Sequence, residues 1–235
     1  MSKKTFVLNA TATAVLMSCV LFLASCNIYK ERKIAGYMQR GTEYLNSSSY
    51  KEAAIEFRNV VQAEPNNAKG HYNLALAYSG MGGLSNLRLS FQEFQKAAEL
   101  DPGNIDAHLK IGELYLLSGE FDKALEKGRI VLAKDKDNVD GRIIAASALA
   151  GKKEFGKAIP MIEDVLKLNH GTIRPYMAAA AIYLANNDAA SAERLFKKAV
   201  AIKGAGAGPR VALAGLYLKG KRQHEAEDEL KKAIE

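Results

Sequence analysis

The sequence repeats a pattern of small and large residues about every 34 residues from Ile34 to the end of the chain. In the unit over residues 105–138, Gly112 and Ala124 stand at the eighth and twentieth positions, and Tyr115 stands at the eleventh. Two antiparallel helices can approach closely where such small residues meet, and large side chains fill the space beside them. A period of this length with this pattern predicts a stack of helix-turn-helix units.

The pattern divides the chain into six units over residues 34–67, 68–104, 105–138, 139–172, 173–206 and 207–235, of which the last is incomplete. The first unit shows the pattern with Tyr37, Gly41, Tyr44, Ala53 and Phe57. These positions resemble the tetratricopeptide repeat. The resemblance implies an all-α fold, a right-handed superhelix of about six helix-turn-helix repeats that follows an N-terminal signal helix.

Three departures from the pattern predict local differences. The second unit is three residues longer than the others, and glycines between Ser79 and Leu89 place the surplus in the turn between its helices. Gly128 stands where an aromatic residue is usual, so we expect an unfilled space and a softer or kinked junction. Pro160 falls early in the second helix of its unit, so that helix either starts late or bends.

The amino terminus has the pattern of a bacterial lipoprotein signal. Two lysines precede a mostly apolar run over residues 6–23, and the polar break and small-residue end point that follow it favour a signal peptide over a spanning helix. Residues 23–26, Leu-Ala-Ser-Cys, resemble a lipobox, in which the cysteine receives the lipid. The resemblance implies a signal peptide over residues 1–25, a lipid on Cys26 and a lipidated tether over residues 26–33.

Two alternatives to this lipid site remain open. The first is an ordinary signal sequence in which Cys26 occurs by chance, and the second is cleavage at a rival site before Cys19. Several acyl chains hold a protein on a membrane almost permanently, so lipid on Cys26 predicts a chain anchored in the bacterial cell envelope and facing the periplasm. Asn27 stands where an aspartate would retain enterobacterial lipoproteins in the inner membrane, which favours the outer membrane.

The ionisable residues form no pattern of a catalytic or metal site. The four histidines, His71, His108, His170 and His224, are far apart and lack metal-ligand spacing. The chain has no Gly-x-Ser-x-Gly motif, and the glycines within residues 203–209 lack the Lys-Ser or Lys-Thr pair of a phosphate loop. The sequence therefore predicts no enzymatic activity, no metal and no cofactor.

The charge balance gives no reason to expect a nucleic acid. The net charge of +7 includes Lys3 and Lys4, so the cleaved chain carries about +5. The basic residues do not align along one face with aromatic residues, as binding to nucleic acid requires.

The resemblance also assigns a candidate binding surface. In tetratricopeptide arrays the fifth and twelfth positions of each first helix face a concave groove, and here most of them are apolar. The residues expected to bind a partner are Met38, Leu45, Tyr72, Leu109, Leu116, Ile143, Met177, Leu184, Val211 and Leu218. An exposed apolar band marks a binding surface, so we expect protein or peptide partners. The alternative is that neighbouring helices bury these positions as core.

The same positions argue against one known use of the groove. Family members that grip acidic carboxyl-terminal tails have a lysine and an asparagine at the fifth and ninth positions of a first repeat. Met38 and Thr42 stand there, and only Asn73 matches the second-repeat part of that clamp. The sequence therefore does not predict a chaperone-tail adaptor.

The arrangement of lipobox and repeats resembles the lipoproteins associated with exosortase (PEP-CTERM) sorting, which implies a scaffold for exopolysaccharide export or protein sorting. Two alternatives remain, a pilotin-like assembly factor for a type IV pilus secretin and the N-terminal part of a longer enzyme. The incomplete last unit lacks a polar capping helix. It predicts either a longer array or a final face covered by another chain, including self-association.

Overall fold

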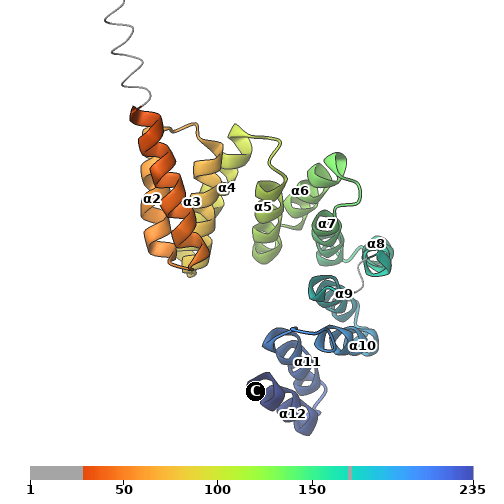
Figure 1. Ribbon diagram of the computed structural model, residues 1–235. Coiled ribbons are helices and arrows are strands. Elements are labelled where there is room, and N and C mark those ends of the chain that lie inside the picture. The colour runs from red at the N-terminus through yellow and green to blue at the C-terminus, as the bar shows by residue number, and fades with distance from the viewer. Residues whose placement is uncertain (1–28, 169–170, 235) are drawn as a thin grey trace, which may run out of the picture. The chain divides into compact units, whose positions relative to one another are not determined.

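The computed structural model describes residues 29–168 and 171–234. Cys26 and the predicted signal peptide lie outside the described residues, as does His170. In the described part of the chain every regular element is a helix (Figure 1). A helix over residues 29–46 is followed by α2 (Tyr50–Ala63), α3 (Ala68–Met81), α4 (Leu84–Leu100), α5 (Ile105–Ser118), α6 (Phe121–Lys134), α7 (Val139–Gly151), α8 (Phe155–Leu168), α9 (Ile173–Ala185), α10 (Ala189–Val200), α11 (Ala207–Lys219) and α12 (Gln223–Ile234).

The helices begin where the repeat predicts them. The five helices α3, α5, α7, α9 and α11 each start on the first residue of a predicted unit. The chain divides after Pro102 into two compact units, and each is described by itself. In the first, α3 packs against both α2 and α4. In the second, each helix packs against the next, and α7 also packs against α5 and α9.

Small residues in the second helix of each repeat permit this close packing, as predicted. The residues at the twentieth repeat position with no exposed surface are Ala53, Ala124, Ala158, Ala192 and Ala226. In the longer second repeat Ser90 takes this place, is fully buried, and donates its hydroxyl to the carbonyl oxygen of Ala75 at 2.8 Å. A Cβ atom on Gly41 would lie 2.7 Å from Cε1 of Phe57, so only glycine fits at that approach.

Asparagine side chains start the first helices of three repeats. Asn67, Asn104 and Asn138 precede α3, α5 and α7, and each side-chain oxygen accepts a hydrogen bond from a backbone N–H three residues later. Such a cap satisfies a donor that the helix itself leaves without a partner. The predicted cap in the turn of the fifth repeat is also present, because Asp188 accepts from the backbone N–H of Ser191 at 2.9 Å.

In every repeat except the longer second one, the residue at the fifteenth position lies in the turn between the two helices and has a left-handed backbone conformation. The residues with positive φ there are Ser48, Gly119, Lys153, Asn187 and Lys221. Only one of them is glycine, although this conformation is costly for residues with a side chain. The hydrophobic helix pairs on either side hold these turns in place.

The three surplus residues of the second repeat are not in its turn, which corrects the sequence prediction. Only Gly82 and Gly83 separate α3 from α4, and both have positive φ. The surplus instead lengthens α4, which has 17 residues where α2 and α6 have 14. Two left-handed glycines reverse the chain so tightly that the extra residues can join the helix.

The surroundings of Gly128 differ from expectation, and the start of α8 excludes one of the two alternatives given for Pro160, a late start. A Cβ atom on Gly128 would lie 3.1 Å from the backbone nitrogen of Ala145, so α7 fills the space that we expected to be empty. Helix α8 starts at Phe155 and contains Pro160, so it does not start late. The carbonyl that this proline leaves without a donor belongs to Gly156, beside which there is open space.

The first helix starts earlier than the repeat. Residues 29–33, which we assigned to the tether, are helical and continue directly into the first repeat. The ammonium group of Lys33 lies 5.8 Å from the ring centre of Tyr37, one helical turn further on. No proline or glycine interrupts residues 29–35, so the helix can extend toward the amino terminus.

Candidate partner-binding groove

Two of the predicted groove residues belong to the core, which corrects their assignment as open contact positions. Leu109 and Ile143 keep only 8% and 5% of their surface exposed. Leu109 packs in one cluster with Val131 and Ile144. Because α7 packs against both α5 and α9, the neighbouring helices cover the fifth position in the third and fourth repeats.

In the first compact unit, which ends at Pro102, the predicted groove residues are half-buried. Met38 and Leu45 pack against the core cluster that contains Phe57. The Tyr72 ring lies 5.5 Å from the ring of Phe94, centre to centre, in a tilted arrangement. These side chains therefore support the fold and present only part of their surface.

Among the predicted groove residues, the exposed fraction is greatest in the sixth repeat, on α11. Leu116, Met177 and Leu184 are half-buried, whereas Val211 and Leu218 on α11 are 51% and 52% exposed. These two residues lie seven apart, which places them on the same face of the helix. The open apolar surface along the predicted groove is therefore concentrated on α11.

An ion-pair network that the sequence analysis missed lies across the first helices of the third to fifth repeats. Arg174 at the start of α9 binds Glu113 of α5 at 2.5 Å and Asp140 of α7 at 3.1 Å. Lys110 binds the same Glu113 at 3.0 Å. The available signal was the 34-residue spacing between Asp140 and Arg174. Charge therefore occupies this part of the surface, in contrast to the apolar face of α11.

A small depression lies between the ends of α9 and α11. It has a volume of about 220 Å³ and is lined by Leu184, Asn187, Ala189, Leu216, Lys219 and Gly220. Leu184 is a predicted groove residue, whereas Leu216 was not predicted because it stands at the tenth position of its repeat. The depression is mostly apolar and has Lys219 on its lining.

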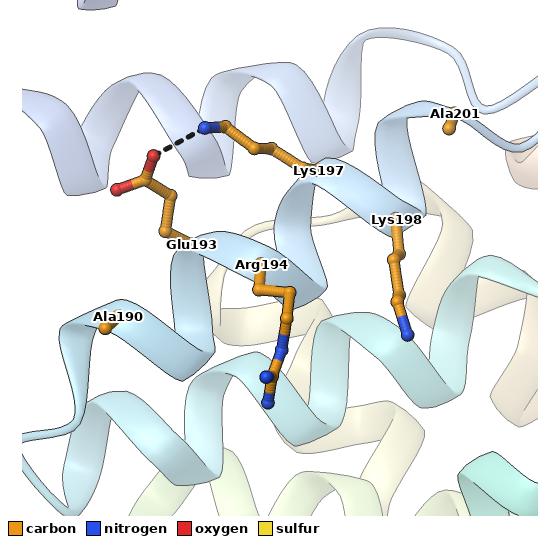
Figure 2. A pocket seen from close by; sticks show the side chains of 6 residues that line it. All are labelled: Ala190, Glu193, Arg194, Lys197, Lys198 and Ala201. Carbon is orange, nitrogen blue, oxygen red and sulfur yellow. Dashed lines mark hydrogen bonds and ion pairs between the residues drawn. The ribbon is translucent and has the colours of Figure 1, made fainter.

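A larger and more polar depression of about 590 Å³ lies over α10 (Figure 2). Figure 2 shows Arg194 and Lys198 extending to one side of the helix, and Lys197 bound to Glu193 on the other. Its remaining lining residues are Ala190 and Ala201. It offers charge without a large apolar side chain.

A charged cluster joins the fifth repeat to the sixth. Arg222 donates to Glu193 at 2.6 Å, and its guanidinium lies 4.2 Å from the ring centre of Tyr217. The hydrogen bond from Arg222, and then that from Lys197, lowers the pKa of Glu193 from 4.5 to about 2. The carboxylate is therefore ionised at neutral pH and ties α10 to the turn before α12.

His71 and Thr42 make hydrogen bonds within the fold, whereas the side chain of His224 is exposed. His71 places Nδ1 at 2.5 Å from Glu93 and Nε2 at 2.9 Å from the carbonyl oxygen of Pro65. Thr42 donates its hydroxyl to the carbonyl oxygen of Met38. Neither side chain carries a charge, so neither residue can replace the lysine with which the clamp binds a carboxylate.

The described residues contain neither a cluster able to hold a metal ion nor a helix able to cross a membrane. No three His, Cys, Asp or Glu residues among them are grouped closely enough to hold a metal ion. None of the helices described here combines the length and the apolar character that crossing a membrane needs.

Known proteins share this repeat. Residues 93–126 match the family described as tetratricopeptide repeat, over a length of one period. The chain is 24% identical over 103 residues to Superkiller complex protein 3 of Homo sapiens, which is 44% of this chain and 6% of that protein. It is 28% identical over 100 residues to Hsp70-Hsp90 organizing protein 1 of Glycine max, 43% of this chain and 17% of that protein. The chain thus spans less than a fifth of either curated relative.

Solved structures share the fold. The crystal structure of a tetratricopeptide repeat protein from Parabacteroides merdae superposes with a TM-score of 0.76 at 16% identity. The superposition covers 86% of this chain and 77% of that one. Together with the matching helix boundaries, this likeness establishes the tetratricopeptide-repeat fold.

Proposed function

We propose that this tetratricopeptide-repeat chain is a scaffold of the bacterial cell envelope that binds a protein partner through its apolar groove positions. The observation that carries the proposal is the open apolar face of α11, where Val211 and Leu218 expose half of their surface. Apolar surface left in water forgoes about 25 cal/mol per Å² that burial would supply. Two such side chains on one face therefore favour contact with another protein.

Substitution on this face tests the binding role. Leu218→Asp should abolish capture of a partner from the native envelope, because it places a charge in the apolar contact. Since Leu218 is 52% exposed, helicity and thermal unfolding should stay unchanged. Ile55→Asp is the matched control, because Ile55 on α2 is 56% exposed and stands outside the predicted groove positions. Equal capture by all three proteins would refute the proposal.

We also propose that lipid on Cys26 holds the scaffold on the membrane, facing the periplasm and in the outer membrane. The support is the lipobox pattern, together with the residues that follow it. Tyr29 is 72% exposed, and Lys30 and Lys33 lie beside it on the depression between the first helix and α2. Tyrosine and lysine are common where a protein meets lipid headgroups.

Cys26→Ala tests the anchor. The variant should leave the membrane fraction and appear in the soluble fraction of the envelope, because a signal peptide without the lipid attachment site supplies no stable anchor. Density-gradient separation of inner and outer membranes locates the unmodified chain. Retention of the variant in the membrane fraction would contradict the lipid assignment, and recovery of the unmodified chain in the inner membrane would contradict the outer-membrane assignment.

The proposed process is exopolysaccharide export or protein sorting, supported by the resemblance of the lipobox and repeat arrangement. The genes beside the coding sequence test this. Exosortase or polysaccharide-export genes support the proposal. Genes for a type IV pilus secretin, or a catalytic domain encoded in the same reading frame, would replace it.

A further inference from the structure

The positive charge of this chain is concentrated in one stretch. Residues 173–222 contain nine Lys and Arg but only two Asp and Glu, so their net charge of +7 equals that of the whole chain. Both acidic residues are engaged within the fold. Asp188 caps α10, and Glu193 is bound by Arg222 and Lys197. The last 13 residues, most of them in α12, add five Asp and Glu and two Lys, so the fifth and sixth repeats together carry +4. The surface that precedes α12 therefore favours an acidic partner.

The first helices of these two repeats contain no Asp or Glu of their own. Arg174 pairs with Glu113 and Asp140, and Arg210 pairs with Glu229 at 2.8 Å. Among the described residues, Lys219 is therefore the basic residue of these two helices that has no acidic partner. Between the large groove residues the face is made of small ones, Ala178 and Ala181 on α9 and Ala212 and Gly215 on α11. A partner backbone can approach closely only where side chains are this small.

Gly215 is not required by packing within the chain. A Cβ atom added there would meet nothing within 4 Å, and the residue lies in the middle of α11. Glycine in the middle of a helix is less favourable than alanine. The open space above it therefore lies free for an atom from outside the described fold.

A slot lies between the ends of α9 and α11, and its lining on α11 begins at Leu216, the residue after this glycine. Six residues link α10 to α11, whereas four link α2 to α3 and α6 to α7. Within the linker Gly204 and Gly206 have positive φ. Helix α11 packs mainly against α10 and α12, in contrast to α7, which packs against both α5 and α9. The depression of about 220 Å³ lies between Leu184 and Leu216, with Lys219 on its lining.

We propose that this face and slot bind an acidic amphipathic helix of the protein partner. An apolar side chain of that helix fills the slot between Leu184 and Leu216, and its carboxylates pair with Lys219 and Lys221. Neither lysine has an acidic side chain within ion-pair distance among the described residues. The proposal rests on the binding role argued above and assigns the partner's chemistry and the repeats that hold it.

The apolar lining distinguishes this partner from a nucleic acid. A phosphate backbone would use the charge, but it would leave Leu184, Leu216, Val211 and Leu218 in water. The described face also lacks the fully exposed rings on which single-stranded nucleic acids stack, because Tyr217 is only 5% exposed and Tyr176 and Tyr183 on α9 are half-buried.

The depression over α10 supplies a matched control. Lys198 lies there, on a different helix of the same basic stretch, and no described acidic residue pairs with it. Lys198→Glu and Lys219→Glu therefore change the net charge equally. If binding depends on the site, and not on the overall field, only the second variant should weaken it.

The experiment selects a display library of 15-residue peptides against the purified full chain. We expect the enriched peptides to carry net negative charge and apolar residues at helical spacing. Lys219→Glu should raise their Kd about tenfold, through loss and reversal of a rim charge, whereas Lys198→Glu should change it by less than about twofold. Gly215→Leu should abolish binding, and Gly215→Ala should raise the melting temperature yet weaken binding.

Other outcomes would overturn the inference. Enrichment of neutral or basic peptides, equal effects of the two lysine variants, or full binding by Gly215→Leu would each do so. So would single-stranded DNA that binds as tightly as the peptides and is lost with Lys219→Glu. If the peptides depend on Met38 or Tyr72 instead, the groove still binds protein and only this inference fails. If they depend on no groove residue, the proposed function fails as well.

Discussion

Gly41→Ala should change the stability of the first repeat in opposite directions with and without the Phe57 ring. The added Cβ would lie 2.7 Å from Cε1 and 2.9 Å from Cζ of Phe57, which is fully buried and cannot swing away. Overpacking of this kind costs about 1–3 kcal/mol, and the higher helix propensity of alanine offsets about 1 kcal/mol. We therefore expect Gly41→Ala to destabilise the unmodified chain by about 0–2 kcal/mol.

Removal of the ring should reverse the sign. Phe57→Ala alone costs about 3–5 kcal/mol, because it leaves a cavity between the two helices of the hairpin. In that background the Cβ of Gly41→Ala has room and contributes its helix propensity, a gain of about 1 kcal/mol. The interaction energy from the double-mutant cycle should then be about 1–3 kcal/mol.

Amide hydrogen exchange of residues 29–46 and α2 is the suitable assay, because stacked repeats need not unfold in one step and a single melting temperature then averages them. Gly156→Ala in α8 is the matched control, since its Cβ would meet nothing within 4 Å and only the propensity gain applies. If Gly41→Ala protects the amides equally in both backgrounds and matches this control, the inferred contact with the ring is wrong.

Three further changes test the turns, the inter-repeat cluster and the caps. Lys153→Gly should stabilise the chain by about 0.5–1 kcal/mol in urea unfolding, because φ at this residue is +63°. The pKa of Glu193 is about 2 in the fold and 4.5 ordinarily, so its stabilising contribution is complete above pH 4.5 and is lost as the pH falls to about 2. Glu193→Gln should therefore flatten that part of the acid-unfolding profile, and an unchanged profile would exclude the link to Arg222. Asn138→Ala should cost about 1 kcal/mol, and Thr172→Ala clearly less, because Thr172 makes no side-chain cap bond; equal losses would show that the caps do not act as described.

The sequence by itself determined the helix pairs and their register. Gly41 and Ala53 allow the close approach of two helices, and an asparagine before a new repeat supplies a cap, wherever in space the hairpin lies. These features act between residues that are near in the chain or paired within one hairpin. The helix pairs and their caps can therefore be predicted from residues that are close in the sequence.

Only the tertiary structure decided which groove positions are open. Leu109 and Val211 occupy the same repeat position, yet their exposed fractions are 8% and 51%. The difference depends on how closely consecutive first helices pack, and no single repeat contains that information. The space left by Gly128 was misjudged for the same reason, because α7 closes it.

The basic stretch over residues 173–222 was readable in the sequence, but its meaning was not. Charge becomes a binding property only when the fold places it beside an apolar slot and leaves it without partners of its own. A 34-residue pattern fixes what each helix presents to its nearest neighbours. Whether consecutive first helices pack on one another, as α7 and α9 do, or leave a depression, as between α9 and α11, decides what remains for another molecule.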